Sequence, residues 1–235
     1  MSIAADLKQA LQRAATALLP QHCFLCAAPS GDHLLCPACA ASLPYLSAER
    51  CPVCALPTPG ANRCGACLKQ APQFDATLAV FRYEFPLDRL IQSLKYAHRL
   101  ASADFLGRAL AKLPTPFRPD LVLPVPLAPA RLAERGFNQA LEIARPLANS
   151  LGVPLELHGV RRHRDTAPQA GLPWKERRQN IRHAFECDID LTGKTVLVVD
   201  DVMTTGATLD ELARTLKAHG AARVENFILA RALKD

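Results

Sequence analysis

Two adjacent carboxylates stand at the end of an apolar run in the segment TVLVVDDVMTTGATLDE, from Thr195 to Glu211. The acids are Asp200 and Asp201, and a hydroxyl-rich loop, TTGAT, follows them and leads into a helical pattern. Backbone N–H groups at the start of a helix, together with the positive end of its dipole, bind phosphate. Carboxylates repel phosphate but accept hydrogen bonds from vicinal hydroxyl groups. A diol at the acids and a phosphate at the helix describe a ribose 5-phosphate.

The same residues have a simpler interpretation, because Asp-Asp after a strand with Thr and Gly behind it can form a cap and a turn. Two other phosphate-binding motifs are excluded. The segment contains neither the Gly-Lys-Ser/Thr of a P-loop nor the Gly-x-Gly-x-x-Gly of dinucleotide-binding proteins.

Eight of the nine cysteines form four Cys-x-x-Cys pairs, CFLC, CPAC, CPVC and CGAC. The pairs make two copies of one arrangement, because nine residues separate Cys26 from Cys36 and nine separate Cys54 from Cys64. Four thiolates at such spacing favour a closed, structural zinc site, with iron–sulfur as the less favoured alternative. We expect about two zinc ions per chain. Their ligands are Cys23, Cys26, Cys36, Cys39, Cys51, Cys54, Cys64 and Cys67.

Two questions about these cysteines stay open at the level of sequence. Disulfides are the rival of zinc, but they suit secreted proteins, and the sequence shows no secretion signal. Pairing of the Cys-x-x-Cys units in sequential order is economical, and an interleaved arrangement is the alternative. Cys187 lies outside the repeat and is expected to be a simple core or surface thiol.

The positive charge is concentrated in one segment. The formal net charge is +6, and residues 161–182 contain seven basic and two acidic side chains, a balance of +5. Charge this local indicates an anionic ligand at one place rather than a surface that coats nucleic acid. A solvated loop is the alternative interpretation.

Apolar periodicity predicts the elements that position these residues. Strands are expected at 77–85, 121–125, 153–158, 194–200 and 224–230, and helices from Pro86 onward and at 102–113, 138–150 and 207–219. Strands that alternate with helices indicate an α/β fold with a parallel sheet covered on both faces. Ligands collect at the carboxyl ends of such strands, which is where Asp200 and Asp201 lie.

The motif VLVVDDVMTTGAT resembles the 13-residue signature of type I phosphoribosyltransferases, which bind phosphoribosyl pyrophosphate. The segment Pro124 to Ala140 (PVPLAPARLAERGFNQA), the segment Arg164 to Phe185 and the double zinc ribbon resemble the ComF family, with its ComFC- and GntX-like members. The resemblance extends from Cys23 to Ala230. It implies a parallel-sheet type I phosphoribosyltransferase-like domain preceded by a small double zinc-ribbon domain.

The resemblance also implies roles for single residues. Asp200 and Asp201 would bind the ribose hydroxyls. The loop for the 5-phosphate maps to Thr204, Thr205, Gly206, Ala207 and Thr208. The pyrophosphate loop would be Pro126 to Arg131, with Arg135 and Gly136 close behind.

A flexible basic loop closes over the site in the same enzymes, and its counterpart here is the segment from Arg161 to Arg178. Magnesium and this loop would neutralise the leaving pyrophosphate. The catalytic residues implied in this way are Arg164, Lys175, Arg177 and Arg178. An oxocarbenium-like transition state needs no covalent nucleophile, and none is assigned.

Two functions from different classes fit this sequence. One is magnesium-dependent transfer of phosphoribose, a glycosyltransferase reaction, to an acceptor that the sequence does not identify. The other is a non-catalytic sensor of phosphoribosyl pyrophosphate or a DNA-processing adaptor, since the family is linked to DNA uptake and competence. Its zinc ribbons would bind a protein partner or single-stranded DNA. We favour a ribbon that faces a protein partner or is purely structural, because the only lysine or arginine residues in the ribbon segment, residues 23–67, are Arg50 and Arg63.

The sequence predicts three parts, namely an N-terminal amphipathic helix at 1–20, a double zinc ribbon at 21–70 and the phosphoribosyltransferase-like domain at 71–235. Polar residues interrupt the first part, so it is not a signal peptide, and no stretch approaches the ~20 apolar residues of a membrane span. We therefore expect a cytoplasmic protein without membrane association.

Overall fold

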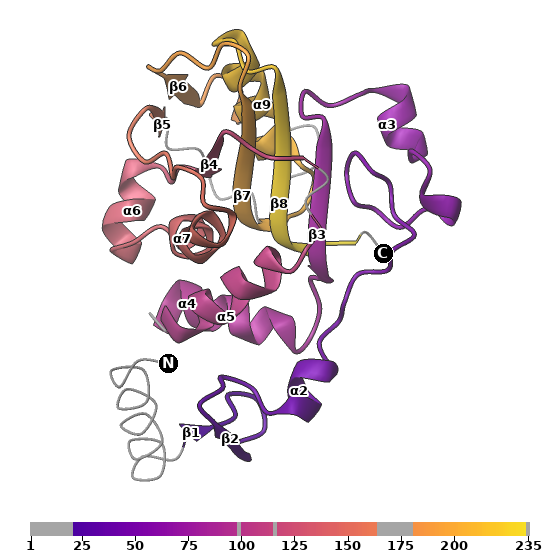
Figure 1. The fold of residues 1–235 in the computed structure, drawn as a ribbon, viewed down its shortest axis with the longest axis vertical. Helices are drawn as coiled ribbons and strands as arrows, with labels where there is room; N and C mark the ends of the chain where they lie inside the picture. Colours follow the sequence, from indigo (N-terminus) through magenta and orange to yellow (C-terminus); the bar gives the residue numbers. More distant parts are fainter. Residues whose placement is uncertain (1–20, 98–99, 115–116, 164–180, 234–235) are drawn as a thin grey trace, which may run out of the picture. The chain divides into compact units, whose positions relative to one another are not determined.

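The computed structural model describes residues 21–97, 100–114, 117–163 and 181–233 (Figure 1). The chain separates into two compact units, Met1–Pro44 and Tyr45–Asp235. The first four cysteines of the repeat therefore belong to one unit and the second four to the unit that contains the large sheet. The helix expected at residues 1–20 lies outside the described residues, and the three-part division of the chain stays a prediction.

The first unit is a short cysteine-rich fold. Strand β1 (Gln21–His22) pairs antiparallel with β2 (Pro29–Gly31), and helix α2 (Pro37–Ala41) follows. Cys36 stands in extended conformation at the N-cap of α2, and Pro37 opens the helix, where its missing N–H costs nothing.

The second unit repeats this local geometry around its own cysteines. Helix α3 (Gly65–Lys69) follows Cys64, which is again an extended N-cap. A short 3-10 helix, η1 (Pro59–Ala61), lies between the two cysteine pairs. After the first pair of each copy, an alanine takes a left-handed conformation, Ala27 at φ 59° and Ala55 at φ 58°. The sequence repeat is therefore a repeat of backbone structure.

The large sheet of the second unit contains four strands in the order β3-β8-β7-β4. All neighbouring pairs are parallel. The strands are β3 (Ala76–Arg82), β4 (Leu121–Pro124), β7 (Thr195–Met203) and β8 (Arg223–Arg231). The parallel sheet and the α/β class predicted from the sequence are confirmed.

Both faces of the sheet are covered, and β7 shows this most clearly. Val196 and Val198 belong to a core cluster that contains Leu212 and Leu216 of helix α9 (Ala207–Ala218). Leu197 and Val199 alternate to the opposite face and are equally buried. Two helices that contact the sheet are α5 (Leu100–Ala111) and α7 (Gln139–Leu151) (Figure 1). Burial on both sides explains why β7 reads as a continuous apolar run.

The helices predicted from Pro86 onward are present in the described residues, with local reasons for their ends. Helix α4 (Leu87–Ala97) buries the four apolar side chains that its spacing placed on one face, Leu87, Leu90, Ile91 and Leu94. Asn138 caps α7 by accepting a hydrogen bond from the N–H of Ala140, and Gly152 ends the helix in a left-handed conformation. In the described residues, no helix is both long and apolar enough to cross a bilayer.

The strand predicted at residues 153–158 is wrong. Only one parallel bridge forms there, between Leu155 and Val122. The Glu156 carboxylate then accepts hydrogen bonds from the N–H groups of His158 and Gly159, both at 2.8 Å, and turns the chain away. A hairpin that the sequence analysis missed follows, in which β5 (Val160–Arg162) pairs antiparallel with β6 (Phe185–Cys187).

Candidate functional site

The two adjacent acids lie at the carboxyl end of β7, as predicted. The N–H of Asp201 donates to Oδ1 of Asp200 at 2.8 Å. Lys95 of α4 reaches the same place, with its Nζ 2.6 Å from Oδ2 of Asp201. The side chains of Lys95 and Asp201 are only 20% and 14% exposed, so this ion pair is largely shielded from water.

The environment makes Asp200 difficult to ionise. Burial and the neighbouring charge of Asp201 raise the pKa of Asp200 to about 7, and Lys95 and Arg162 oppose this rise only in part. Burial alone would lower the pKa of Lys95, but the attraction of Asp201 outweighs it and the net shift is upward. The two acids are therefore costly to ionise together, and a ligand that donates hydrogen bonds or carries a cation would relieve this cost.

The loop after the acids turns sharply at Gly206, which has φ 81° and caps the start of α9. A Cβ atom at this position would lie 2.5 Å from Cε of Met203, the end of a flexible side chain, so the turn requires glycine for its positive φ and an added side chain would displace Met203. The N–H of Ala207 donates to Oγ1 of Thr205 at 3.3 Å. Through this turn, the first residues of α9 follow directly on the loop.

Asp200 and the loop line one small cavity of about 50 Å³. Its wall consists of Asp200, Val202, Met203, Thr204, Thr205, Gly206, Ala207, Thr208 and Leu209. The structure thus brings together one carboxylate and all five loop residues that the sequence analysis assigned to a sugar phosphate. Asp201 does not line this cavity, but its backbone N–H donates to the carboxylate of Asp200, which does.

The remaining predicted anion-binding residues lie after β4, the strand that neighbours β7. Part of the predicted pyrophosphate loop is helical, because α6 spans Pro129–Arg135. Arg131 and Arg135 are half-buried, and Nη1 of Arg135 donates to Oε1 of Gln139 at 3.0 Å. Gly136 ends α6 with φ 72°. The wall of the small cavity does not include these three residues.

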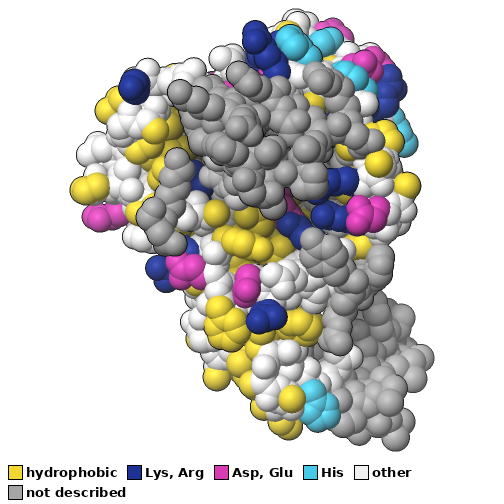
Figure 2. Space-filling model, turned by 180° about the vertical axis from the view of Figure 1, so that it is seen from behind, with side chains coloured by type: hydrophobic (Ala, Val, Ile, Leu, Met, Phe, Trp, Pro, Cys, Tyr) yellow, Lys and Arg dark blue, Asp and Glu magenta, His cyan; other side chains and the backbone are white. Residues whose placement is uncertain are grey.

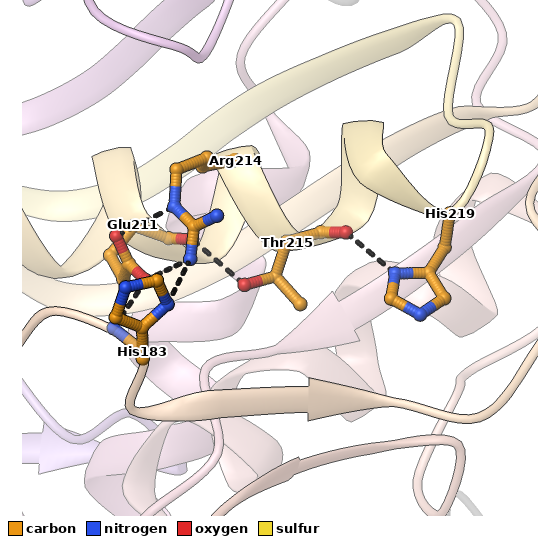
Figure 3. A network of polar contacts seen from close by, with 5 residues as sticks. All are labelled: His183, Glu211, Arg214, Thr215 and His219. Carbon is orange, nitrogen blue, oxygen red and sulfur yellow. Dashed lines mark hydrogen bonds and ion pairs between the residues drawn. The ribbon is translucent and has the colours of Figure 1, made fainter.

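The predicted catalytic residues Arg164, Lys175, Arg177 and Arg178 lie outside the described residues. The chain after them is tied to α9 by a polar network centred on Glu211 (Figure 3). The Glu211 carboxylate accepts from the His183 N–H at 2.6 Å and from Nε of Arg214 at 3.0 Å. Burial raises the pKa of Glu211, but these hydrogen bonds outweigh burial and lower it. The network fixes the chain at His183 to the helix that follows the loop.

Each group of four cysteines has the geometry of a metal site. The sulfur atoms of Cys23, Cys26, Cys36 and Cys39 lie within 4.8 Å of one another, and so do those of Cys51, Cys54, Cys64 and Cys67. Sulfurs about 2.3 Å from a tetrahedral zinc ion are about 3.8 Å apart. The distances are 3.7 Å between Cys26 and Cys36 and 3.5 Å between Cys54 and Cys64. The sites are therefore sequential, which decides against the interleaved pairing.

Backbone N–H groups favour the thiolate form of Cys51 in the second group. Burial raises the pKa of Cys51, but N–H groups of Cys64, Cys54 and Val53 outweigh it and bring that pKa down to about 7. Cys51, Cys54 and Cys67 also belong to the core cluster of the sheet and α9. Cys187 is a buried core thiol, in line with its prediction.

A buried arginine holds the start of the loop. Arg231, at the end of β8, donates from Nη1 to the carbonyl oxygens of Met203, at 2.9 Å, and Thr204. Its Nε donates to the carbonyl oxygen of Cys54 at 2.8 Å. The sequence analysis gave Arg231 no role, although a charged residue that ends the apolar run VENFILAR was a usable signal.

The described surface does not form a continuous basic face in the view of Figure 2. Lys and Arg side chains occur there singly and in a small group beside the grey atoms, with Asp and Glu side chains among them.

Comparison with known proteins agrees with both parts of this description. A double zinc ribbon domain matches residues 14–68, and a phosphoribosyl transferase domain matches residues 138–235. The chain is 34% identical to the DNA utilization protein YhgH of Escherichia coli K12 over 90% of each chain. It is 36% identical to competence protein F of Haemophilus influenzae over 84% of each chain. The competence protein ComFC of Streptococcus pneumoniae is 27% identical, over 85% of this chain and 89% of that protein.

Proposed function

Since the chain belongs to the ComF family, whose members join a double zinc ribbon to a phosphoribosyltransferase-like domain, we propose that it binds phosphoribosyl pyrophosphate with magnesium. The observation that carries this proposal is that Asp200 and residues Thr204 to Thr208 line the same cavity. This arrangement supports a ribose 5-phosphate whose hydroxyl groups meet the carboxylate and whose phosphate meets the start of α9.

Different residues bind the ribose and the 5-phosphate of the ligand. Asp200 and Asp201 accept hydrogen bonds from the ribose hydroxyls, and Lys95 limits the repulsion between the two acids. The loop and the first N–H groups of α9 receive the 5-phosphate. The donor set fits magnesium, because hard carboxylate oxygens are its preferred protein ligands. When bound, magnesium would neutralise charge on pyrophosphate as it leaves C1 of the ribose.

The basic residues would bind the pyrophosphate part of the ligand. Arg131 and Arg135 follow β4 at the same edge of the sheet as the acids, and we assign them with Gly136 to the pyrophosphate. Arg164, Lys175, Arg177 and Arg178 of the basic segment would cover the bound ligand and exclude water. Their positive charge would stabilise the negative charge that develops on the leaving pyrophosphate in the transition state.

Whether the protein transfers phosphoribose or only senses its donor depends on the acceptor. The competence and DNA utilization names of the relatives support a role in the handling of imported DNA. The zinc ribbons would then contact a protein partner or, less favoured by their charge, single-stranded DNA. A cytoplasmic location is part of the proposal, because the eight metal-binding thiols must stay reduced.

Calorimetry with phosphoribosyl pyrophosphate and magnesium tests the proposal. We expect the wild type to bind and the double variant Asp200→Ala/Asp201→Ala to lose at least about tenfold in affinity, since both acceptors of the diol are removed. Asp104→Ala, an exposed acid on α5, is the control and should bind as the wild type does. Equal affinity of the double variant would contradict the site.

A second measurement separates enzyme from sensor. Release of pyrophosphate is followed while bases, nucleosides and nucleotides are offered as acceptors. Product formation supports transfer, whereas tight binding without product from any acceptor supports the sensor.

A further inference from the structure

Arg231 is an unusual charged residue, because it is only 4% exposed and none of the ion pairs in the described chain includes it. Its hydrogen bonds all go to backbone carbonyl oxygens. These belong to Cys54, at 2.8 Å, to Met203, at 2.9 Å, to Ala232, at 2.7 Å, and to Thr204. We call this set of contacts the Arg231 clamp.

The clamp joins two sites that the chain builds separately. Cys54 belongs to the second cysteine group, and Met203 and Thr204 begin the loop at the cavity. The residues also share the wall of a larger cavity of about 680 Å³, which includes Cys54, Cys67, Arg231 and the loop from Met203 to Ala207. The second cysteine group and the loop are therefore neighbours within one compact unit.

The charge of the cysteine group explains how an unpaired guanidinium can be buried here. A zinc ion with four thiolates carries a net charge of about −2. A buried cation needs such compensation, because desolvation without a counter-charge is costly. Carbonyl oxygens supply part of this compensation, and the thiolate group would supply the rest when zinc is bound. The fork of the guanidinium fixes the backbone positions of Met203 and Thr204.

We infer that Arg231 is a positioning residue that makes the shape of the phosphate loop depend on the metal-loaded second cysteine group. Loss of the metal removes the negative charge and loosens Cys54, so the clamp no longer holds the first residues of the loop. The inference rests on the proposed function for its ligand, but the change in the loop can be measured without any ligand.

Hydrogen exchange of a peptide that spans residues 200–208 is the first readout. In Arg231→Lys, which keeps the charge but loses the fork, we expect this peptide to exchange about 10–100-fold faster, while zinc content and secondary structure stay as in the wild type. Arg231→Met should show a larger change. Arg108→Met, an exposed arginine of α5, is the control and should leave the peptide unchanged.

Binding is the second readout, at a temperature where all variants are folded. Ribose 5-phosphate should bind Arg231→Lys about 10–100-fold more weakly than wild type, and inorganic pyrophosphate should bind both equally, since it does not need the loop. A residue that only stabilised the fold would lower the melting temperature without separating these two ligands.

Metal removal is the third readout. Cys64→Ser and Cys39→Ser each remove a half-buried ligand, from the second and the first group respectively. Only Cys64→Ser should accelerate exchange in residues 200–208, because every hydrogen bond described for Arg231 lies within Tyr45–Asp235. Should Cys64→Ser fail to fold, chelation of the remaining zinc from Cys39→Ser replaces it, and unchanged exchange of residues 200–208 after that loss would overturn the dependence on metal.

The outcomes are distinct. Unchanged exchange of the loop in Arg231→Lys and Arg231→Met would overturn the inference, whatever binds. A wild type that binds neither ribose 5-phosphate nor phosphoribosyl pyrophosphate would refute the proposed function, and accelerated exchange in the variants would still support the clamp.

Discussion

Asp200 is a single residue whose position at the candidate site lowers the stability of the folded protein when its carboxyl group is ionised. Burial and Asp201 raise its pKa to about 7, far above the usual range of an aspartate. In the unfolded chain this repulsion and this burial are absent. Between about pH 4 and pH 7 the folded state therefore holds a proton that the unfolded state has lost, and stability falls as the pH rises through this window.

Asp200→Asn tests this directly. Asparagine cannot ionise, so the variant should be more stable than the wild type at pH 8 and the difference should vanish near pH 4. Its upper limit is about 4 kcal/mol, from about three pKa units at about 1.4 kcal/mol each. Melting temperatures between pH 4 and pH 8 measure it, with Asp104→Asn as an exposed control. A difference that does not depend on pH would show that Asp200 ionises normally.

The loop between β7 and α9 shows how a single element sets ligand geometry. Gly206 and Gly193 both have positive φ, 81° and 73°, so an alanine at either position is strained. Only at Gly206 would the added Cβ meet another atom, Cε of Met203 at 2.5 Å. The two glycines are thus a matched pair that differs in its neighbours.

We predict that Gly206→Ala and Gly193→Ala lower the free energy of unfolding by similar amounts, about 1–2 kcal/mol each. Only Gly206→Ala should weaken the binding of ribose 5-phosphate, because Gly206 and the displaced side chain of Met203 both line the small cavity, whereas Gly193 does not. Chemical denaturation and calorimetry measure the two effects. If both variants bind equally well, the turn at Gly206 does not shape the phosphate site.

At the scale of the whole molecule, the two cysteine groups differ in their surroundings although their backbones repeat. In the first group Cys26 is exposed, whereas Cys51, Cys54 and Cys67 of the second group are buried in the core of the larger unit. A closed zinc site contributes folding energy wherever it lies. The second group contributes it to the same core as the sheet.

Metal analysis should return about two zinc ions per chain, with all eight thiols reduced. A thiol reagent should release the ions in two phases, the first from the group that contains the exposed Cys26 and the second from the group without an exposed thiol, because attack requires access to sulfur. Absorbance of a zinc indicator follows both phases, and Cys26→Ser should remove the fast one. Oxidised cysteine pairs, or a single phase for both ions, would contradict this description.

The sequence by itself determined the features that depend on neighbouring residues. The apolar run of β7, the acids at its end, the turn into α9 and the repeated cysteine spacing all follow from local backbone geometry, and the parallel sheet follows from the alternation of elements. The strand predicted at 153–158 failed for a local reason as well, since the turn made by Glu156 is a side-chain effect that apolar periodicity does not register.

Only the tertiary structure decided which distant residues meet at the site. Lys95 reaches Asp201 from α4, and Arg231 joins Cys54, 177 positions away in the chain, to the start of the loop. Such contacts depend on the strand order β3-β8-β7-β4 and on packing against it. Local periodicity contains no information about that order, so the counter-charge of the acids and the clamp on the loop became visible only in the folded chain.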